Sequence, residues 1–265
     1  MNLTGLIVAI AIAAVVGLTF GLYPQLDLMI AAPFHLISLF GFHFGLRLYP
    51  PLMLARDIGL WVGTALILPA VAALVLKLAL PRRRLLLPGR SILFLMTTIV
   101  LGPGLLVNVV LKEHWGRPRP IDVTKFGGDQ HFVSWWDPRG DCPKNWSFVS
   151  GDVSGAIWTL APAALVPPQW RALAYGAALA LGMGMAAARM MAGAHFFTDV
   201  VFAGVFTFLI VWIVHGLIYR WPCTRLADDA IERTIARIAM PGHNFIVGLF
   251  GRKPPTTTDG RDRSI

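Results

Sequence analysis

Three short segments of the sequence contain most of its chemically reactive polar side chains. They are Lys112–Pro120, Asn145–Gly155 and Ala188–Asp199, and each adjoins a long apolar run. Cations at the end of an apolar helix are costly to bury, so a cluster of them is expected to face an anion. Arginine presents a planar fork of N–H donors that matches the oxygens of a phosphate. If the fold brings these segments together, they predict a phosphate-binding site.

The cations expected to hold the phosphate are Lys112, Arg119 and Arg189. Prolines on both sides of Arg119 restrict its backbone to an extended conformation. We expect the neighbouring Arg117 to extend to lipid headgroups, as long basic side chains do at a membrane surface. The alternative for the whole cluster is that all of its cations extend to headgroups in this way.

His195 and Asp199 suggest the reacting groups. They are four residues apart, so on a helix they would share a face. A carboxylate can hold one imidazole nitrogen and leave the other as a nucleophile. Gly193, between Arg189 and His195, would allow the chain to bend so that these residues converge. The spacing also suits a pair of metal ligands, but no further cluster completes such a site, so we expect no metal.

Ser150 and Gly151 precede another apolar run and could begin a helix. There they could offer a hydroxyl and backbone N–H groups to an anion, because the N-terminus of a helix attracts negative charge. The alternative is that Ser150 is an ordinary N-terminal cap.

The elements that must position these residues cross a membrane. The chain has 265 residues, of which 56% are hydrophobic and 14% are charged, and its mean hydropathy is +0.65. Soluble domains have roughly 25% charged residues, so the composition indicates an integral membrane protein. The net charge of +9 resides mostly in short loops and the tail. That distribution favours contacts with anionic lipid headgroups over nucleic acid binding.

Six apolar stretches approach the roughly 20 residues that a spanning helix needs. They are Leu3–Leu22, Gly59–Leu80, Ser91–Leu111, Val153–Val166, Ala172–Ala187 and Val200–Tyr219. The basic loop Pro81–Arg90 is expected to be cytoplasmic. Both termini then lie in the cytoplasm and the three polar segments meet on the outer face. An odd number of spans between any two of them would separate them.

The remaining segments are expected to lie at membrane surfaces or outside the fold. The mixed segment Pro24–Arg56 is predicted to be helical and interfacial or re-entrant, and the first apolar run a retained anchor. The segment Thr224–Met240 predicts an amphipathic helix, either on the inner membrane surface or docked on the bundle. Cys142 and Cys223 fall on opposite sides of the membrane, so no disulfide is expected between them.

The three polar segments resemble the motifs of the type 2 phosphatidic acid phosphatase (PAP2) superfamily, which includes membrane lipid phosphatases and vanadium haloperoxidases. Its first motif is Lys, six residues, Arg-Pro, and Lys112 and Arg119–Pro120 match it. Its third motif is Ser-Arg, five residues, His, three residues, Asp. Arg189, His195 and Asp199 match this motif, and Ala188 stands in place of the serine. Its second motif, Pro-Ser-Gly-His, is matched only in part, by Val149–Asp152.

The resemblance implies a mechanism that needs no metal or cofactor. His195 would attack phosphorus in line, Asp199 would orient it, and water would hydrolyse the resulting phosphohistidine. The residues that would hold the phosphate are Lys112, Arg119, Ser150, Gly151 and Arg189.

Asp152 stands where the family has the histidine that protonates the leaving alkoxide. As a candidate general acid it must take up a proton near neutral pH, which a nearby dianion favours and nearby cations oppose. We therefore expect an acidic optimum or a good leaving group such as a diphosphate. The alternatives are that His114 or His131 supplies the proton, or that hydrolysis has been lost.

The sequence thus predicts an all-α, six-span bundle with an interfacial segment after the first span. Its expected divisions are a phosphatase domain, 1–220, a cytoplasmic amphipathic helix region, 221–251, and a disordered tail, 252–265. The resemblance implies a bacterial inner membrane, a periplasmic active site, and a substrate such as phosphatidic acid, phosphatidylglycerophosphate, undecaprenyl diphosphate or a lipid A phosphate. The rival is a catalytically silent lipid-phosphate binder or carrier, whereas a channel or transporter would need more polar residues along its spans. The sequence does not specify an oligomeric state.

Overall fold

The computed structural model describes residues 2–37, 43–140, 146–224 and 226–250, a part of the chain that contains helices and no strand. Five helical stretches there are long and apolar enough to cross a membrane. They are Leu3–Leu22 (α1), Pro50–Ala79 (α3), Gly89–His114 (α4, η2 and α5), Pro168–Met191 (α8) and Phe197–Arg220 (α9 and η5). The prediction of an all-α membrane bundle is confirmed. The tail 252–265 and Cys142 lie outside the described residues.

The fourth predicted span folds as two short helices, α6 (Gly151–Trp158) and α7 (Leu160–Leu165). The break at Thr159 has a cause in the sequence, because Pro162 has no N–H to donate to the Trp158 carbonyl and its ring crowds that turn. Together the two helices rise only about 22 Å, less than the roughly 30 Å of a hydrocarbon core. Most side chains of α6 and α7 are buried within the bundle, so these two helices contact other helices more than lipid. The count of six spans stays a prediction.

At the end of the bundle that holds the polar loops, α3 and α8 extend well beyond their predicted bounds. α3 begins at Pro50 instead of Gly59, with two prolines in its first turn, where a missing N–H has no cost. The segment Pro24–Arg56, which was expected at the membrane surface, is therefore shorter than predicted. It contains α2 (Gln25–Leu36) and the short helix η1 (Gly45–Leu48). α8 continues past Ala187 to Met191. These extra turns bring Arg56 and Arg189 to the end of the bundle that holds the polar loops.

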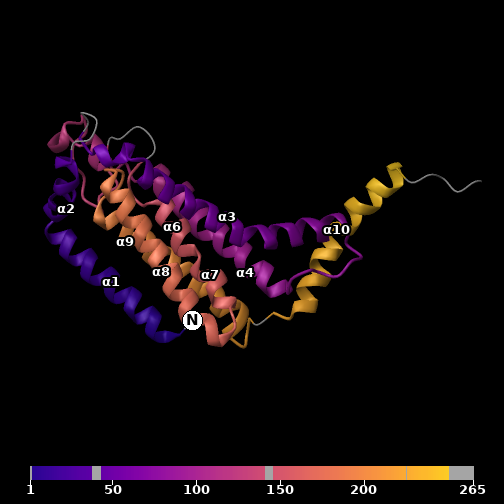
Figure 1. Ribbon diagram of the computed structural model, residues 1–265. Coiled ribbons are helices and arrows are strands. Elements are labelled where there is room, and N and C mark those ends of the chain that lie inside the picture. The colour runs from indigo at the N-terminus through magenta and orange to yellow at the C-terminus, as the bar shows by residue number, and fades with distance from the viewer. Residues whose placement is uncertain (1, 38–42, 141–145, 225, 251–265) are drawn as a thin grey trace, which may run out of the picture.

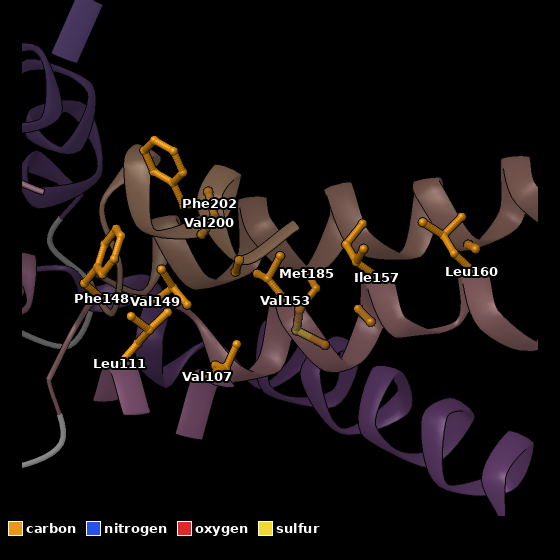
Figure 2. Packing of buried hydrophobic residues seen from close by; sticks show 13 residues of the cluster. Val107, Leu111, Phe148, Val149, Val153, Ile157, Leu160, Met185, Val200 and Phe202 are labelled. Carbon is orange, nitrogen blue, oxygen red and sulfur yellow. The ribbon is translucent and has the colours of Figure 1, made fainter. Parts of the chain in front are cut away.

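The core of the bundle lies between α6, α7, α8 and α9, directly below these loops. Val153, Ile157 and Leu160 recur at helical spacing along α6 and α7, and Figure 2 shows them in a row with Met185 of α8 nearby. Gly182 lets α8 approach closely, because a Cβ there would lie 2.2 Å from the Ile157 side chain. Phe148 and Val149 close the same core at the loop end. The segment that leads into α6 is thereby fixed by packing.

The two termini of the described chain lie at the end opposite the polar loops (Figure 1). At that end the Trp212 Nε1 atom, in the last part of α9, donates to the Asn2 carbonyl at 3.1 Å. The C-terminal helix α10 (Asp228–Phe250) extends away from the bundle there, and Lys77 of α3 pairs with its Glu232 at 2.8 Å. The first part of α10 is thus held against α3. Its position on a membrane surface stays a prediction.

Candidate active site

His195 lies in the turn between α8 and α9, not on a helix. The expectation that it shares a helical face with Asp199 is therefore wrong, since α9 begins at Phe197. The predicted bend at Gly193 is confirmed, with φ +65°, and a Cβ at that position would lie 2.6 Å from the Phe44 ring. The Gly193 carbonyl accepts a hydrogen bond from the Ile121 N–H at 3.1 Å. This bond ties the turn to the loop that carries Arg119.

The imidazole of His195 is oriented by a backbone carbonyl. Its Nδ1 atom lies 2.8 Å from the Ser147 carbonyl oxygen. Because a carbonyl only accepts, Nδ1 must carry the hydrogen, which leaves the lone pair of the neutral ring on Nε2. Asp199 Oδ2 is 4.0 Å from Nδ1 and instead accepts from the Ser147 hydroxyl at 2.5 Å. Asp199 thus acts on His195 through Ser147, a residue that the sequence reasoning did not single out.

His195 is 2% exposed, and its surroundings favour the neutral imidazole. Burial lowers the pKa of His195 well below 6.5, and the charges of Arg189, Arg119 and Lys112 lower it further, against the opposing bond to Ser147. The three predicted cations therefore lie near the predicted nucleophile. The expectation that residues from three separate segments meet at one end of the bundle is confirmed.

The cations approach from different elements. Lys112 begins α5 at the end of its span, within electrostatic range of Arg119, Arg189 and Asp152. Arg119 precedes the short helix η3 (Pro120–Asp122) and is extended, with φ −79° and ψ 156°, as its flanking prolines predict. Arg189 lies in the last turn of α8.

The start of α6 supplies the second predicted segment. Ser150 is its N-terminal cap and is buried, with its hydroxyl accepting from the Val153 N–H at 3.4 Å. This contact is the ordinary capping role that was held as the alternative. A Cβ on Gly151 would lie 2.9 Å from Asn108 Oδ1, so the first turn of α6 lies close to η2 (Val100–Leu111). Binding of an anion by this turn stays a prediction.

Asp152 lies between two arginines. Arg56 Nε donates to Asp152 Oδ2 at 3.0 Å, and Arg189 Nε is also 3.0 Å from that oxygen. Arg56 is not among the predicted site residues, because the expected second span begins only at Gly59. The proline pair that begins α3 was the signal that could have found it. His114, an alternative proton donor, is exposed, and its Nδ1 lies 2.8 Å from the Val110 carbonyl of its own helix.

Arg117 is fully buried, so the expectation that it extends to lipid headgroups is wrong. Its Nη2 donates to Asp27 Oδ2 at 2.7 Å, and its Nη1 donates to Thr198 Oγ1 at 2.8 Å and to Asp199 Oδ1. Its Nε donates to the Val133 carbonyl at 2.9 Å. Two carboxylates in a buried site need a cation, and Arg117 provides it.

Asp27 of α2 is likewise not among the predicted site residues. It is 1% exposed and accepts hydrogen bonds from the Thr198 N–H at 3.1 Å and the Thr198 hydroxyl at 2.6 Å. An aspartate from one helix thereby caps the N-terminus of another. The pair formed by Asp27 and Arg117 fixes the start of α9, and with it the position of Asp199.

The residues that meet around His195 lie in a region that matches a known protein family. The sequence profile of the PAP2 superfamily matches residues 91–223, half of the chain. The chain belongs to the PAP2 superfamily. The matched region contains every site residue that the sequence predicted, from Lys112 to Asp199. Arg56 and Asp27, which the structure adds to this PAP2 site, lie outside it.

Curated proteins similar to this PAP2 chain include three named lipid A 4'-phosphatase. The one from Francisella tularensis subsp. novicida (strain U112) is 43% identical over 132 residues, which cover 49% of this chain and 60% of that protein. The one from Rhizobium leguminosarum is 45% identical over 104 residues, covering 39% and 45%. The one from Rhizobium etli is 43% identical over 102 residues, covering 38% and 40%. The chain thus matches about half the length of these relatives. No solved structure matches it.

Replacing Arg117 by methionine should destabilise the fold, because it leaves the carboxylates of Asp27 and Asp199 buried without their cation. Removing one partner of a buried ion pair costs about 3–5 kcal/mol. Thermal unfolding in detergent measures the change, and Arg139→Met is the control, since that arginine is exposed and pairs with Asp137 of its own loop. Equal midpoints for the two variants would contradict the structural role of Arg117.

Proposed function

We propose that the chain is a membrane phosphatase that removes phosphate from a lipid phosphate monoester or diphosphate through a phosphohistidine intermediate. The observation that carries the proposal is the environment of His195. Its Nδ1 is bonded to the Ser147 carbonyl, burial and neighbouring charges keep the ring neutral, and three cations surround it. A neutral imidazole with a fixed tautomer is a nucleophile, and three cations stabilise the charge of a transferring phosphoryl group.

The reaction proceeds in two displacements. Lys112, Arg119 and Arg189 hold the phosphate oxygens while the His195 Nε2 lone pair forms a bond to phosphorus and the bond to the leaving oxygen breaks. As Nε2 becomes bonded, the positive charge on the ring is stabilised by the Ser147 carbonyl at Nδ1. Water then attacks phosphorus, the P–N bond breaks, and inorganic phosphate leaves.

Asp152 is proposed to protonate the leaving oxygen and then to take a proton from the attacking water. In the ligand-free site its Oδ2 atom lies 3.0 Å from both Arg56 Nε and Arg189 Nε. A phosphate dianion bound by Arg189 takes over one of these two partners and leaves the carboxylate beside the leaving oxygen. No metal takes part in these steps. Among the described residues, no group of three or more His, Cys, Asp or Glu side chains could hold one.

The proposed substrate is a phosphate of lipid A, because the similar curated proteins carry that substrate in their names. Phosphatidic acid, phosphatidylglycerophosphate and undecaprenyl diphosphate are the other members of the test panel. We further propose that the site faces the periplasm from the inner membrane, with both termini in the cytoplasm. The basic loop at 81–90 lies at the end opposite His195, which supports this orientation.

The second candidate function is a catalytically silent lipid-phosphate binder or carrier. One observation favours it, since an ion-paired carboxylate stands where the family has an acid histidine. In that case Lys112, Arg119 and Arg189 would still bind phosphate, but the phosphate would stay on the lipid.

Replacing His195 by asparagine should abolish phosphate release, with a loss of roughly 10³-fold or more, because no other group can form the covalent intermediate. The measurement is phosphate released from the purified lipids in detergent, and activity should persist in EDTA. His114→Asn is the matched control and should retain activity. If the unsubstituted protein releases phosphate no faster than the His195 variant, the enzyme proposal fails and the carrier remains.

The acid limb of the profile of kcat/KM against pH should lie below pH 6.5. His195 must be neutral to attack, and its pKa is lowered from 6.5 by burial and by the nearby cations, so activity falls only as the pH drops through that lower value. Arg119→Gln removes one of these charges, which raises the pKa of His195 and moves the limb to higher pH. Arg119→Lys keeps the charge and should leave the limb in place. A limb at the same pH in both variants contradicts this assignment.

A further inference from the structure

Arg56 contributes a cation to the site from a part of the chain outside the PAP2 match. It lies near the start of α3, and its side chain is 41% exposed. Its Nε–H donates a hydrogen bond to Asp152 Oδ2, whereas its Nη1 is 3.5 Å from the exposed Asp57. Asp152 is the better-aligned and less exposed of the two partners, so Arg56 is directed at the active site.

The two arginines that contact Asp152 do so in different ways. Arg189 Nε is 3.0 Å from the same oxygen, yet this buried atom has no hydrogen-bond acceptor within the described chain. The N–H of Arg189 is therefore near the carboxylate but not aligned with it, whereas that of Arg56 is aligned. A carboxylate this close to a guanidinium gains energy by rotating into a bidentate pair. Here the bond to Arg56 opposes that rotation.

A bidentate pair between Asp152 and Arg189 would compete with the substrate. Arg189 is one of the three cations around His195, and the carboxylate would occupy the donors that a phosphate needs. The acid that this chain has in place of the family's histidine thus brings a competitor into the phosphate site. A second cation that holds the carboxylate aside removes that competition.

We propose that Arg56 is a positioning residue that holds Asp152 away from Arg189 and so keeps Arg189 available for the phosphate of the substrate. The prediction for KM rests on the proposed function, because KM is measured only if the chain hydrolyses a lipid phosphate. The prediction for binding needs only inorganic phosphate, so the role of Arg56 and the proposed function can fail separately. A chain that binds phosphate without hydrolysing lipid would end the proposed function and leave the role of Arg56 open to measurement.

Arg56→Gln should raise KM, and the dissociation constant of inorganic phosphate measured by calorimetry, by about two- to fivefold, the range of a partly exposed ion pair. The binding of inorganic phosphate is the deciding readout, because Asp152 is also proposed to act in the chemical step and kcat reports both of its roles. Arg56→Lys keeps the charge without the fork and should fall between. Arg139→Gln, the same change at an exposed arginine, should leave both constants unchanged.

The decisive comparison places Arg56→Gln in an Asp152→Asn background. An amide does not form the competing ion pair, so the second substitution should make the first one silent in phosphate binding. Equal weakening in both backgrounds would mean that Arg56 binds phosphate directly and would overturn the proposal. Unchanged binding in the single variant, or no phosphate binding by the unsubstituted protein, would also overturn it. Melting temperatures identify any variant that fails to fold.

Discussion

The candidate site depends on one buried interaction, the pairing of the Arg117 guanidinium with the carboxylates of Asp27 and Asp199. These groups come from a loop, from α2 and from α9, and all are excluded from solvent. Buried charges tolerate few arrangements, because each must be neutralised and hydrogen-bonded at once. The pairing therefore fixes the start of α9 and the Asp199 side chain. Asp199 in turn holds Ser147, whose carbonyl orients His195.

Charge is divided between the two sides of His195. On the buried side, two carboxylates and one guanidinium leave a formal charge of −1, which N–H and O–H donors satisfy. On the other side, the cations of the phosphate site outnumber Asp152. The buried side orients the imidazole, while the cationic side is the one proposed to bind the phosphate. This division explains why the two arginines of the Arg117–Pro118–Arg119 stretch differ in role, one structural and one expected to bind phosphate.

Local spacing was enough to predict the all-α membrane bundle, the convergence of the cations with His195, and the bend at Gly193. Each depends on hydropathy, on motif spacing or on the backbone preference of one residue. The broken fourth span was missed because Pro162 acts through a hydrogen bond that hydropathy does not register. Asp27, Arg56 and the burial of Arg117 were missed for a different reason. They depend on contacts between helices far apart in the chain, which no local pattern reports.

The central claim is that phosphate passes through a covalent bond to the His195 imidazole. The direct measurement is rapid quenching of the protein with a lipid phosphate labelled at phosphorus, followed by mapping of the labelled peptide. The account predicts acid-labile, alkali-stable label on the peptide that contains His195, lost in His195→Asn and retained in His114→Asn. Label on another residue, or steady hydrolysis with no labelled intermediate, would contradict it.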